Sequence, residues 1–378
     1  MTETKNSKEY QICKQCIMDT SDPDIVFDAN GSCNHCTNSI IRLNKEIFID
    51  PIIKKHNLDK LINNIKQDGV NNKYDCLIGL SGGVDSSYLA YVAVKQFGLR
   101  PLAVHLDNGW NSELAVENIK NIVNSLNIDL YTHVLNWEEF KALQKAFLRA
   151  SVIDIEMLTD HAIGVALYEV SKKYNIKYFL SGYNYQSESV MPAKWLYPYK
   201  MDSLNIKDIY KKEGDGGLKL KTFKLLNFYQ YLTFGKNSMA LIPILNYLDY
   251  NKKEALKIIE TQLNWRNYGN KHDESIFTKF YQDVILPQKF KIDKRRAHYS
   301  SLICSGQMTR DEGLEEMQKE LLSQQDYKNN LSYFLKKLNI SEGEFQTIMD
   351  TKPRLHWDYR SFAKRKFKIG KLYRAIFK

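Results

Sequence analysis

A segment rich in glycine and serine, residues 79–87, separates two apolar runs and limits what this chain can fold into more than any other feature. The run at 74–78 is short enough for a buried strand, and the run at 88–94 can form a helix. A strand, a glycine loop and a helix start bring backbone N–H groups around one point, an arrangement that favours bound phosphate. The segment therefore predicts a phosphate site, with an ordinary strand–turn–helix connection as the plainer alternative.

The side chains of this segment suit a phosphate and a metal ion. Gly82 and Gly83 lack the Cβ atoms that would block a close approach. The hydroxyls are donors, and the carboxylate of Asp85 can hold a divalent cation. The expected pyrophosphate-binding residues are Ser81, Gly82, Gly83, Val84, Asp85, Ser86 and Ser87.

The motif Ser81-Gly-Gly-Val-Asp-Ser86 resembles the signature of the PP-loop ATP pyrophosphatases. It differs from a Walker A loop, because no Gly-Lys-Ser/Thr follows the glycines. The resemblance implies cleavage of ATP between the α- and β-phosphates. Pyrophosphate is then released, and AMP is left on an oxygen of the substrate.

Strand-like and helix-like segments alternate along the first half of the chain. Strands are expected near 100–107, 129–135 and 177–181, and helices near 113–126, 137–150 and 160–174. This order predicts an α/β fold with a doubly wound parallel sheet. Ligands bind beyond the carboxyl ends of such strands, where the loops 81–87, 107–110 and 182–188 fall. Asp107 and Asn184 are candidates for holding the nucleotide, and turn formation is an equally good explanation for both.

Four of the six cysteines form two Cys-x-x-Cys pairs, Cys13 with Cys16 and Cys33 with Cys36. Two such pairs at this separation predict a zinc ribbon or knuckle. Four cysteine ligands leave no open position, so the expected zinc is structural. A disulfide or a redox pair are the alternatives, and His35 is a possible replacement ligand.

The net charge of +10 is concentrated at one end of the chain. Residues 351–378 contain ten Lys or Arg and one acid, which leaves the rest of the chain close to neutral. A nearly neutral body does not favour nucleic acid as a partner. The basic tail alternates with aromatic and aliphatic residues, so it either touches anionic membrane lipid or packs on its own domain. The first residues lack the apolar core of a signal peptide, and a cytoplasmic protein is expected.

A dense polar block follows a tyrosine-rich stretch at 191–270. His272 and Glu274 offer a base and an acid, and Ser275 offers a hydroxyl. Lys271, Arg295 and Arg296 are cations that can bind phosphate or carboxylate. A solvated polar helix is the alternative explanation for this block.

Taken together, the motifs resemble those of the N-acetyl sugar amidotransferases, PP-loop enzymes of bacterial surface-glycan synthesis such as pseudaminic acid and O-antigen (lipopolysaccharide) formation. The resemblance covers about 13–310. The quoted segments are the cysteine pairs, Ser81–Ser86, Thr159–His161, Ser181–Asn184, Lys271–Ser275, Lys294–Arg296 and Ser305–Arg310.

The resemblance implies that an ATP- and Mg²⁺-dependent enzyme adenylates the acetamido oxygen of a sugar and replaces it with ammonia. The sugar would be nucleotide-linked or a nine-carbon acid, and a separate glutaminase subunit would supply the ammonia. Asp107, Gly182 and Asn184 would face the nucleotide, and Asp85 the metal. Substrate binding and proton transfer would fall to Lys271, His272, Glu274, Ser275, Arg295 and Arg296.

These observations predict five regions along the chain. They are a four-cysteine zinc head (1–40), a helical linker (41–73), a PP-loop domain (74–190), an insertion with the polar block (191–315) and a helical C-terminal region (316–378). A tRNA-thiolating enzyme and a non-catalytic ATP-binding scaffold of a glycan pathway are the rival functions. Sulfur transfer is disfavoured because it requires further cysteines near the ATP loop, and none lies between Cys76 and Cys304.

Overall fold

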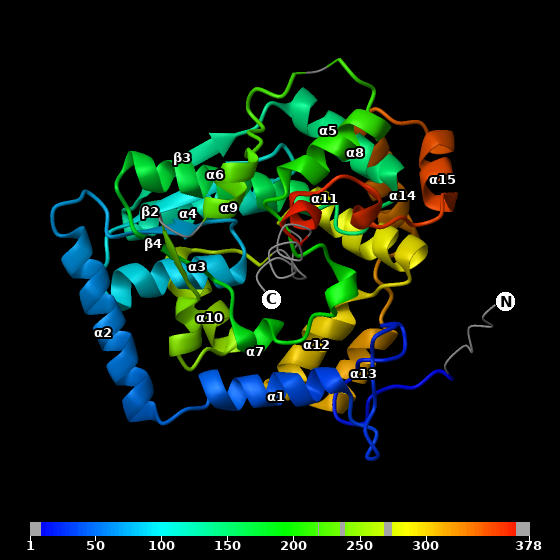
Figure 1. The fold of residues 1–378 in the computed structure, drawn as a ribbon. Coiled ribbons are helices and arrows are strands. Elements are labelled where there is room, and N and C mark those ends of the chain that lie inside the picture. The colour runs from blue at the N-terminus through cyan, green and yellow to red at the C-terminus, as the bar shows by residue number, and fades with distance from the viewer. Residues whose placement is uncertain (1–8, 218, 235–238, 268–273, 368–378) are drawn as a thin grey trace, which may run out of the picture.

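The computed structural model describes residues 9–217, 219–234, 239–267 and 274–367. At its centre five parallel strands form one sheet in the order β3–β2–β1–β4–β5 (Figure 1). The strands are β1 (Cys76–Gly79), β2 (Pro101–Asp107), β3 (Asp129–Val134), β4 (Tyr178–Leu180) and β5 (Ala240–Ile242). The predicted doubly wound α/β sheet is therefore confirmed.

The edge strand β5 lies outside the expected strand pattern. It pairs with β4 but belongs to the 191–270 stretch, where no alternation of strands and helices is recognisable. Three residues are too few to show a strand period in the sequence. Pairing with β4 makes this segment a strand.

The strand order places a ligand crevice at one point of the sheet. From β1 the chain winds outward through β2 to β3, and it then returns to the other side of β1 as β4. The loops after β1 and β4 therefore leave the sheet in opposite directions and open a crevice between them. The glycine loop follows β1, and Gly182 follows β4.

Helices surround the sheet and build the rest of the molecule. Their bounds are α1 (Asn34–Glu46), α2 (Pro51–Gly69), α3 (Val84–Tyr91), α4 (Glu113–Leu126), α5 (Trp137–Ala150), α6 (Met157–Lys173), α7 (Tyr185–Glu188), α8 (Ser203–Glu213), α9 (Phe228–Thr233), α10 (Lys252–Leu263), α11 (Ile276–Phe280), α12 (Lys294–Cys304), α13 (Arg310–Gln318), α14 (Gln324–Leu338) and α15 (Glu342–Asp350). Shorter or irregular turns are η1 (Val92–Gln96), η2 (Ala193–Trp195), η3 (Ile244–Tyr247), η4 (Tyr281–Phe290) and η5 (His356–Asp358).

The expected helices α4 and α5 are confirmed to the residue, because local capping fixes their ends. Ser112 accepts a hydrogen bond from the N–H of Ala115, and Asn127 ends α4 in the left-handed conformation. In α5, Asn136 accepts a hydrogen bond from the N–H of Glu139, and Ser151 ends the helix in the left-handed conformation. Such caps are encoded in a few neighbouring residues, so the sequence reveals them.

The two faces of the sheet are covered by different helices. One face packs against apolar residues of α2, α3, α4 and α10, and the other against α6. Alternate residues of β1 divide between the two cores, Cys76 and Ile78 on the first and Leu77 on the second. Both faces of β1 are thus buried, as expected for a central parallel strand.

The N-terminal cysteine segment docks on the C-terminal helices. A third core joins the four cysteines to residues of α5, α11, α12 and α14. Figure 1 shows α1 next to α12, with which it is in contact, although 247 residues of sequence lie between the two helices. The head and the C-terminal region therefore form one body.

The basic tail is described only up to residue 367. At its start the carboxylate of Asp202 accepts hydrogen bonds from the backbone of Phe362 and Ala363, and both side chains are buried. This beginning packs on its own domain, whereas residues 368–378 lie outside the described residues. Lipid contact stays a prediction. Among the described residues, no helix combines the length and the apolar character that crossing a membrane requires.

Candidate functional site

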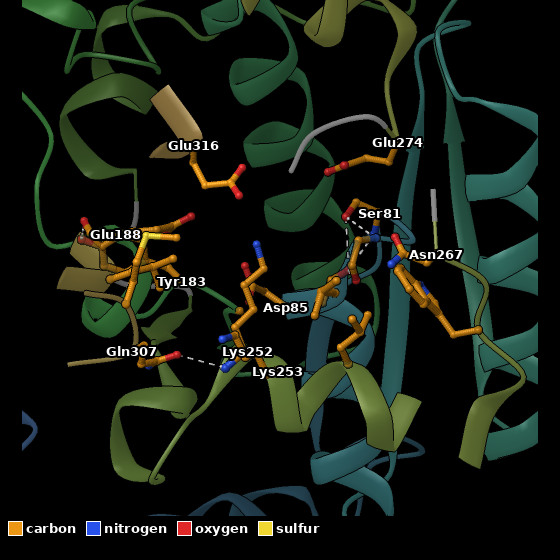
Figure 2. A pocket seen from close by; sticks show the side chains of 18 of the residues that line it. Ser81, Asp85, Tyr183, Glu188, Lys252, Lys253, Asn267, Glu274, Gln307 and Glu316 are labelled. Carbon is orange, nitrogen blue, oxygen red and sulfur yellow. Dashed lines mark hydrogen bonds between the residues drawn. The ribbon is translucent and has the colours of Figure 1, made fainter. Parts of the chain in front are cut away.

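A cavity of about 590 Å³ opens at the crevice between β1 and β4. Residues of the glycine loop, of the loop after β4, of α10 and of the α12–α13 segment line it. Figure 2 shows Lys252, Lys253 and Asp85 at its centre, Ser81, Asn267 and Glu274 on one side, and Tyr183 and Glu188 on the other. A volume of this size suits a nucleotide.

The glycine loop is held in shape by its own hydroxyl groups. The hydroxyls of Ser86 and Ser87 both donate to the carbonyl of Gly83, at 3.1 and 2.6 Å. The N–H of Gly83 donates to Ser81 Oγ at 3.2 Å. Of the seven expected phosphate-binding residues, Ser81, Gly83, Val84, Asp85 and Ser86 line the cavity.

Gly82 and Ser87 support the loop from behind. Gly82 has a φ of 83°, and a Cβ there would lie 2.7 Å from the carbonyl oxygen of Ala115 in α4. The carbonyl of Gly82 accepts a hydrogen bond from Trp265 Nε1 at 2.8 Å. Ser87 is fully buried beneath the loop. Only glycine fits at position 82, because both the left-handed backbone and the contact with α4 exclude a side chain.

The loop after β4 brings Gly182 to the cavity but not Asn184. A Cβ on Gly182 would lie 3.2 Å from the backbone carbon of Asp85, so this glycine lets two loops approach closely. Asn184 is fully buried and accepts hydrogen bonds from the N–H and the hydroxyl of Ser187, both at 2.9 Å. It caps α7 and does not belong to the described lining of the cavity.

Asp107 has a similar local partner. Its Oδ1 accepts a hydrogen bond from the N–H of Gly109 at 2.9 Å, and Gly109 has a φ of 80°. Asp107 is likewise outside the described lining of the cavity. For both Asp107 and Asn184 these bonds are the ones that the turn interpretation requires.

His105, in the middle of β2, is a core histidine. It donates from Nδ1 to the carbonyl of Leu80 at 2.9 Å and accepts from Asn111 Nδ2 at 3.1 Å, which fixes one neutral tautomer. Burial lowers its pKa, and the Leu80 carbonyl opposes that shift. His105 therefore positions the last residue before the loop and carries no charge there.

Two lysines of α10 supply positive charge at the cavity. Lys252 and Lys253 lie in the first turn of that helix and line the cavity. The side chain of Asn251 caps the helix by accepting hydrogen bonds from the N–H groups of Lys253 and Glu254. The sequence does not single out these two cations, because lysine is common on solvated helix faces. Ammonium groups beside a phosphate-binding loop can neutralise pyrophosphate.

Of the predicted polar block, one residue lines the cavity and another caps a helix beside it. Glu274 lines the cavity, where Figure 2 shows its carboxylate near Ser81. Ser275 caps α11 by accepting from the N–H of Thr278 at 3.3 Å, and it pairs with Asn111 of the loop after β2. The predicted residues Lys271 and His272 lie outside the described residues.

Arg295 lines a second, smaller cavity beside the first. This cavity has a volume of about 280 Å³, and both cavities are lined by Lys252, Leu302 and Glu316. The guanidinium of Arg295 pairs with Asp293 at 2.7 Å and donates to the carbonyl of Lys319 at 2.8 Å. The arginine is thus held rigidly in the wall of a polar space next to the glycine loop.

Arg296 points the other way, toward the cysteine head. Its guanidinium donates to the carbonyl of Ile17 at 2.6 Å and pairs with Asp19 at 3.2 Å. Arg310 acts similarly, with three hydrogen bonds to the carbonyls of Cys13 and Cys16. The structure therefore places Arg296 and Arg295 in different surroundings, although they are adjacent in the sequence.

The four predicted cysteine ligands form one cluster. Their sulfur atoms are 3.6 Å apart for Cys13 and Cys36, 3.8 Å for Cys16 and Cys33, and 3.7 Å for Cys33 and Cys36. A tetrahedron with Zn–S bonds of about 2.3 Å has S–S edges of about 3.8 Å, so the cluster fits zinc. All four side chains are fully buried, and backbone N–H groups point at the sulfurs of Cys13, Cys16 and Cys33.

His35 is not part of this cluster. Its Nε2 lies 2.6 Å from Asp22 Oδ2, and the cluster that the described residues form contains cysteines alone. The cluster is closed, which is typical of a structural metal site.

Comparison with known proteins identifies two regions. Residues 55–216 match a family model described as NAD synthase, and residues 274–373 match one described as LPS biosynthesis protein WbpG-like, C-terminal domain. The first match bears out the expected PP-loop fold, and the second the expected resemblance to proteins of glycan synthesis, whereas the predicted domain bounds stay a prediction. The two segments share the lining of the larger cavity, while α10 lies between them and in neither.

Similarity to individual proteins is weaker. An uncharacterized protein of Methanocaldococcus jannaschii is 26% identical over 155 residues, which are 39% of this chain and 54% of that protein. The chain thus spans about half the length of this relative. An NMN synthetase from Francisella tularensis is 19% identical, over 61% of this chain and 91% of that one, with a TM-score of 0.28. An NH3-dependent NAD synthetase from Campylobacter jejuni is 18% identical, over 56% and 85%, with a TM-score of 0.28.

Proposed function

Because this chain joins a PP-loop domain of the NAD synthase type to a WbpG-like C-terminal domain, we propose that it is an ATP-dependent amidotransferase acting on an N-acetylated sugar. It converts an acetamido group of the sugar into an acetamidino group during the synthesis of a bacterial surface glycan of the O-antigen or pseudaminic acid kind. The observation that supports this most is the shared cavity. The glycine loop of the first domain and the α12–α13 segment of the second line the same space.

The reaction has two steps, whose atoms balance. The acetamido oxygen attacks the α-phosphorus of ATP, the bond to the β-phosphate breaks, and pyrophosphate leaves. Ammonia then attacks the carbon of the adenylated imidate, and AMP departs with the former acetamido oxygen. Adenylation is needed because an amide carbon is a poor electrophile and its oxygen a poor leaving group.

The chain's own groups divide this work. The hydroxyls and amides of Ser81–Ser87, with Lys252 and Lys253, hold the pyrophosphate as its charge develops. Asp85 holds Mg²⁺, which neutralises the phosphate oxygens when bound. Glu274 lies on the Ser81 side of the cavity and takes the proton that ammonia loses.

The smaller cavity with Arg295 is the proposed sugar subsite. It adjoins the nucleotide cavity at Lys252, Leu302 and Glu316, so a sugar there presents its acetamido group toward the loop. Its walls mix carboxylates, cations and amides, groups that form hydrogen bonds with sugar hydroxyls. A free nine-carbon acid or a nucleotide-linked sugar are the candidate acceptors.

Ammonia comes from outside this chain, from a separate glutaminase subunit. Hydrolysis of glutamine by a cysteine nucleophile needs a thiol at the site, and none of the described lining residues of either cavity is a cysteine. The same observation weighs against sulfur transfer to tRNA. Free ammonium is expected to replace the glutaminase in a purified reaction.

The test is AMP formation by the full chain with ATP, Mg²⁺, ammonium and a panel of nucleotide-linked and free nine-carbon acetamido sugars. We expect AMP only when the right sugar is present, and mass spectrometry should detect the exchange of an oxygen atom for an NH group. The Asp85→Asn variant should lose roughly 10²- to 10³-fold in rate, as when a transition-state contact is removed. Asp59→Asn, on an exposed position of α2, is the matched control and should react like the wild type.

Two results would contradict the proposal. AMP that forms only with tRNA would identify a thiolating enzyme. No AMP with any acceptor, while ATP still binds, would leave an ATP-binding scaffold of the pathway.

A further inference from the structure

The segment around α10 holds the glycine loop at two points. This helix packs on α3 and α4 through Ala255, Ile259 and Leu263, in the same core as the first face of the sheet. Beyond its end, Trp265 donates to the carbonyl of Gly82 at 2.8 Å. Just before its start, the hydroxyl of Tyr250 donates to Oδ1 of Asp85. The part of the chain between the two matched family segments thus contacts the loop at its first glycine, Gly82, and at Asp85.

Tyr250 is a buried hydrogen-bond donor to Asp85. Its side chain is 1% exposed, and its ring lies 5.7 Å from that of Tyr88. Burial, followed by the negative charge of Asp85, raises the pKa of the Tyr250 hydroxyl well above its usual value. An ionised carboxylate can only accept a hydrogen bond, so the Tyr250 hydroxyl is the donor in its bond to Asp85.

The backbone of Tyr250 is fixed from the WbpG-like region. Gln307, which follows α12, donates from Nε2 to the carbonyl of Tyr250 at 3.0 Å and accepts from the N–H of Lys252 at 3.1 Å. Gln307 itself lines the larger cavity (Figure 2). The tyrosine hydroxyl is thus positioned by a residue of the C-terminal domain at the wall of the site.

We propose that Tyr250 is a positioning residue that orients the Asp85 carboxylate for a divalent cation. A carboxylate has roughly four lone-pair positions, so one hydrogen bond to Oδ1 can fix its orientation without preventing the group from binding an ion. Partners of metal ligands of this kind commonly change metal affinity by about 10- to 100-fold. The inference rests on the proposed role of Asp85 in ATP chemistry, and its test needs no sugar.

The experiment compares Tyr250→Phe with Tyr88→Phe in the full chain. Each variant loses one phenolic hydroxyl and keeps its ring, and the two rings pack against each other. Mn²⁺ binding is followed by electron paramagnetic resonance in the presence of an ATP analogue with a methylene group between the α- and β-phosphates. We expect Mn²⁺ affinity to fall about 10-fold or more in Tyr250→Phe and to stay unchanged in Tyr88→Phe.

A double variant separates positioning from general loosening of the fold. Asp85→Asn combined with Tyr250→Phe should lose no more Mn²⁺ affinity than Asp85→Asn alone, because the hydroxyl acts through that carboxylate. Additive losses would overturn the proposal, as would Mn²⁺ binding by Tyr250→Phe at wild-type or higher affinity. Either result leaves the proposed amidotransferase untouched. If no sugar of the panel led to AMP formation, the proposed amidotransferase function would be rejected, but the Mn²⁺ comparison would still test the role of Tyr250.

Discussion

The cysteine head and the cavity at the glycine loop are the two proposed ion sites of the molecule, and they are constructed in opposite ways. The head draws its four cysteines from residues 13–36 and buries all of them. The cavity draws its lining from residues as far apart as Ser81 and Glu316, and it is open enough for a nucleotide. Asp85, the proposed metal ligand of the glycine loop, accepts a hydrogen bond from Tyr250 there.

The difference follows from what each site must do. A structural ion is bound once, so complete coordination and exclusion of water give the most stability. A reacting ion must share its coordination sphere with phosphate oxygens, so the protein has to leave ligand positions free. Local sequence is enough to build the first kind of site, whereas the second depends on the tertiary fold.

The largest effect is expected from breaking the head. Replacing Cys16 with serine removes one of four ligands, and on the order of 10 kcal/mol of zinc-binding free energy is coupled to folding in such sites. We expect loss of bound zinc, measured by atomic emission, and a chain that is largely insoluble. Cys76→Ala is the control, because Cys76 lies in β1 outside the cluster and should keep one zinc per chain. Full solubility of Cys16→Ser without zinc would show that the head is dispensable for folding.

A smaller effect that concerns only the cavity is expected from Gly82→Ala. The variant forces a left-handed residue to carry a Cβ, and that atom would meet the carbonyl of Ala115 at 2.7 Å. The loop must move away from α4, so ATP affinity measured by calorimetry should fall about 10-fold or more, the equivalent of at least 1.4 kcal/mol.

Gly216→Ala is the matched control for that variant. Gly216 also has a left-handed backbone, with a φ of 77°, but nothing lies within 4 Å of the position of its Cβ. It should cost only the backbone strain of about 1–2 kcal/mol and leave ATP affinity unchanged. Equal ATP affinity in Gly82→Ala and the wild type would mean that the loop shape is not what binds phosphate.

Sequence reasoning succeeded where neighbouring residues decide the structure. The cysteine cluster, the glycine loop and the capped helices α4 and α5 all depend on short-range patterns. It could not separate a ligand from a turn residue at Asp107 or Asn184, because Asp-Asn-Gly and Gly-x-Asn segments look alike in both roles. The structure gives both side chains local partners.

The rest of the site could not be read from spacing, because it is assembled by packing. Tyr250 and Trp265 belong to no recognisable motif, yet both contact the glycine loop from either end of α10. Arg295 and Arg296 are neighbours in the sequence, but a helix points successive side chains in different directions. One therefore faces the smaller cavity and the other the cysteine head.

The smallest effect on the cavity is expected from replacing Arg310, which joins the cysteine head to α13. Its guanidinium donates to the carbonyls of Cys13 and Cys16 at 3.0–3.1 Å, and it begins α13, whose residues Glu312 and Glu316 line the larger cavity. Arg310→Ala leaves the four ligands in place, so zinc should stay at one per chain. The free energy of unfolding should fall by about 2 kcal/mol, as for lost hydrogen bonds to a charged group.

Loss of the Arg310 contact should also change substrate binding in the larger cavity. Because α13 is held against the head on one side and lines the site on the other, we expect the KM for the sugar to rise several-fold in Arg310→Ala while the KM for ATP changes less. Arg266→Ala is the control, since its pairing with Glu117 is largely exposed and such pairs contribute about 0.2–1 kcal/mol. An Arg310→Ala enzyme that is less stable but has wild-type KM values would show that head and cavity are independent. A shift in KM with zinc retained would show that the closed site helps to shape the open one.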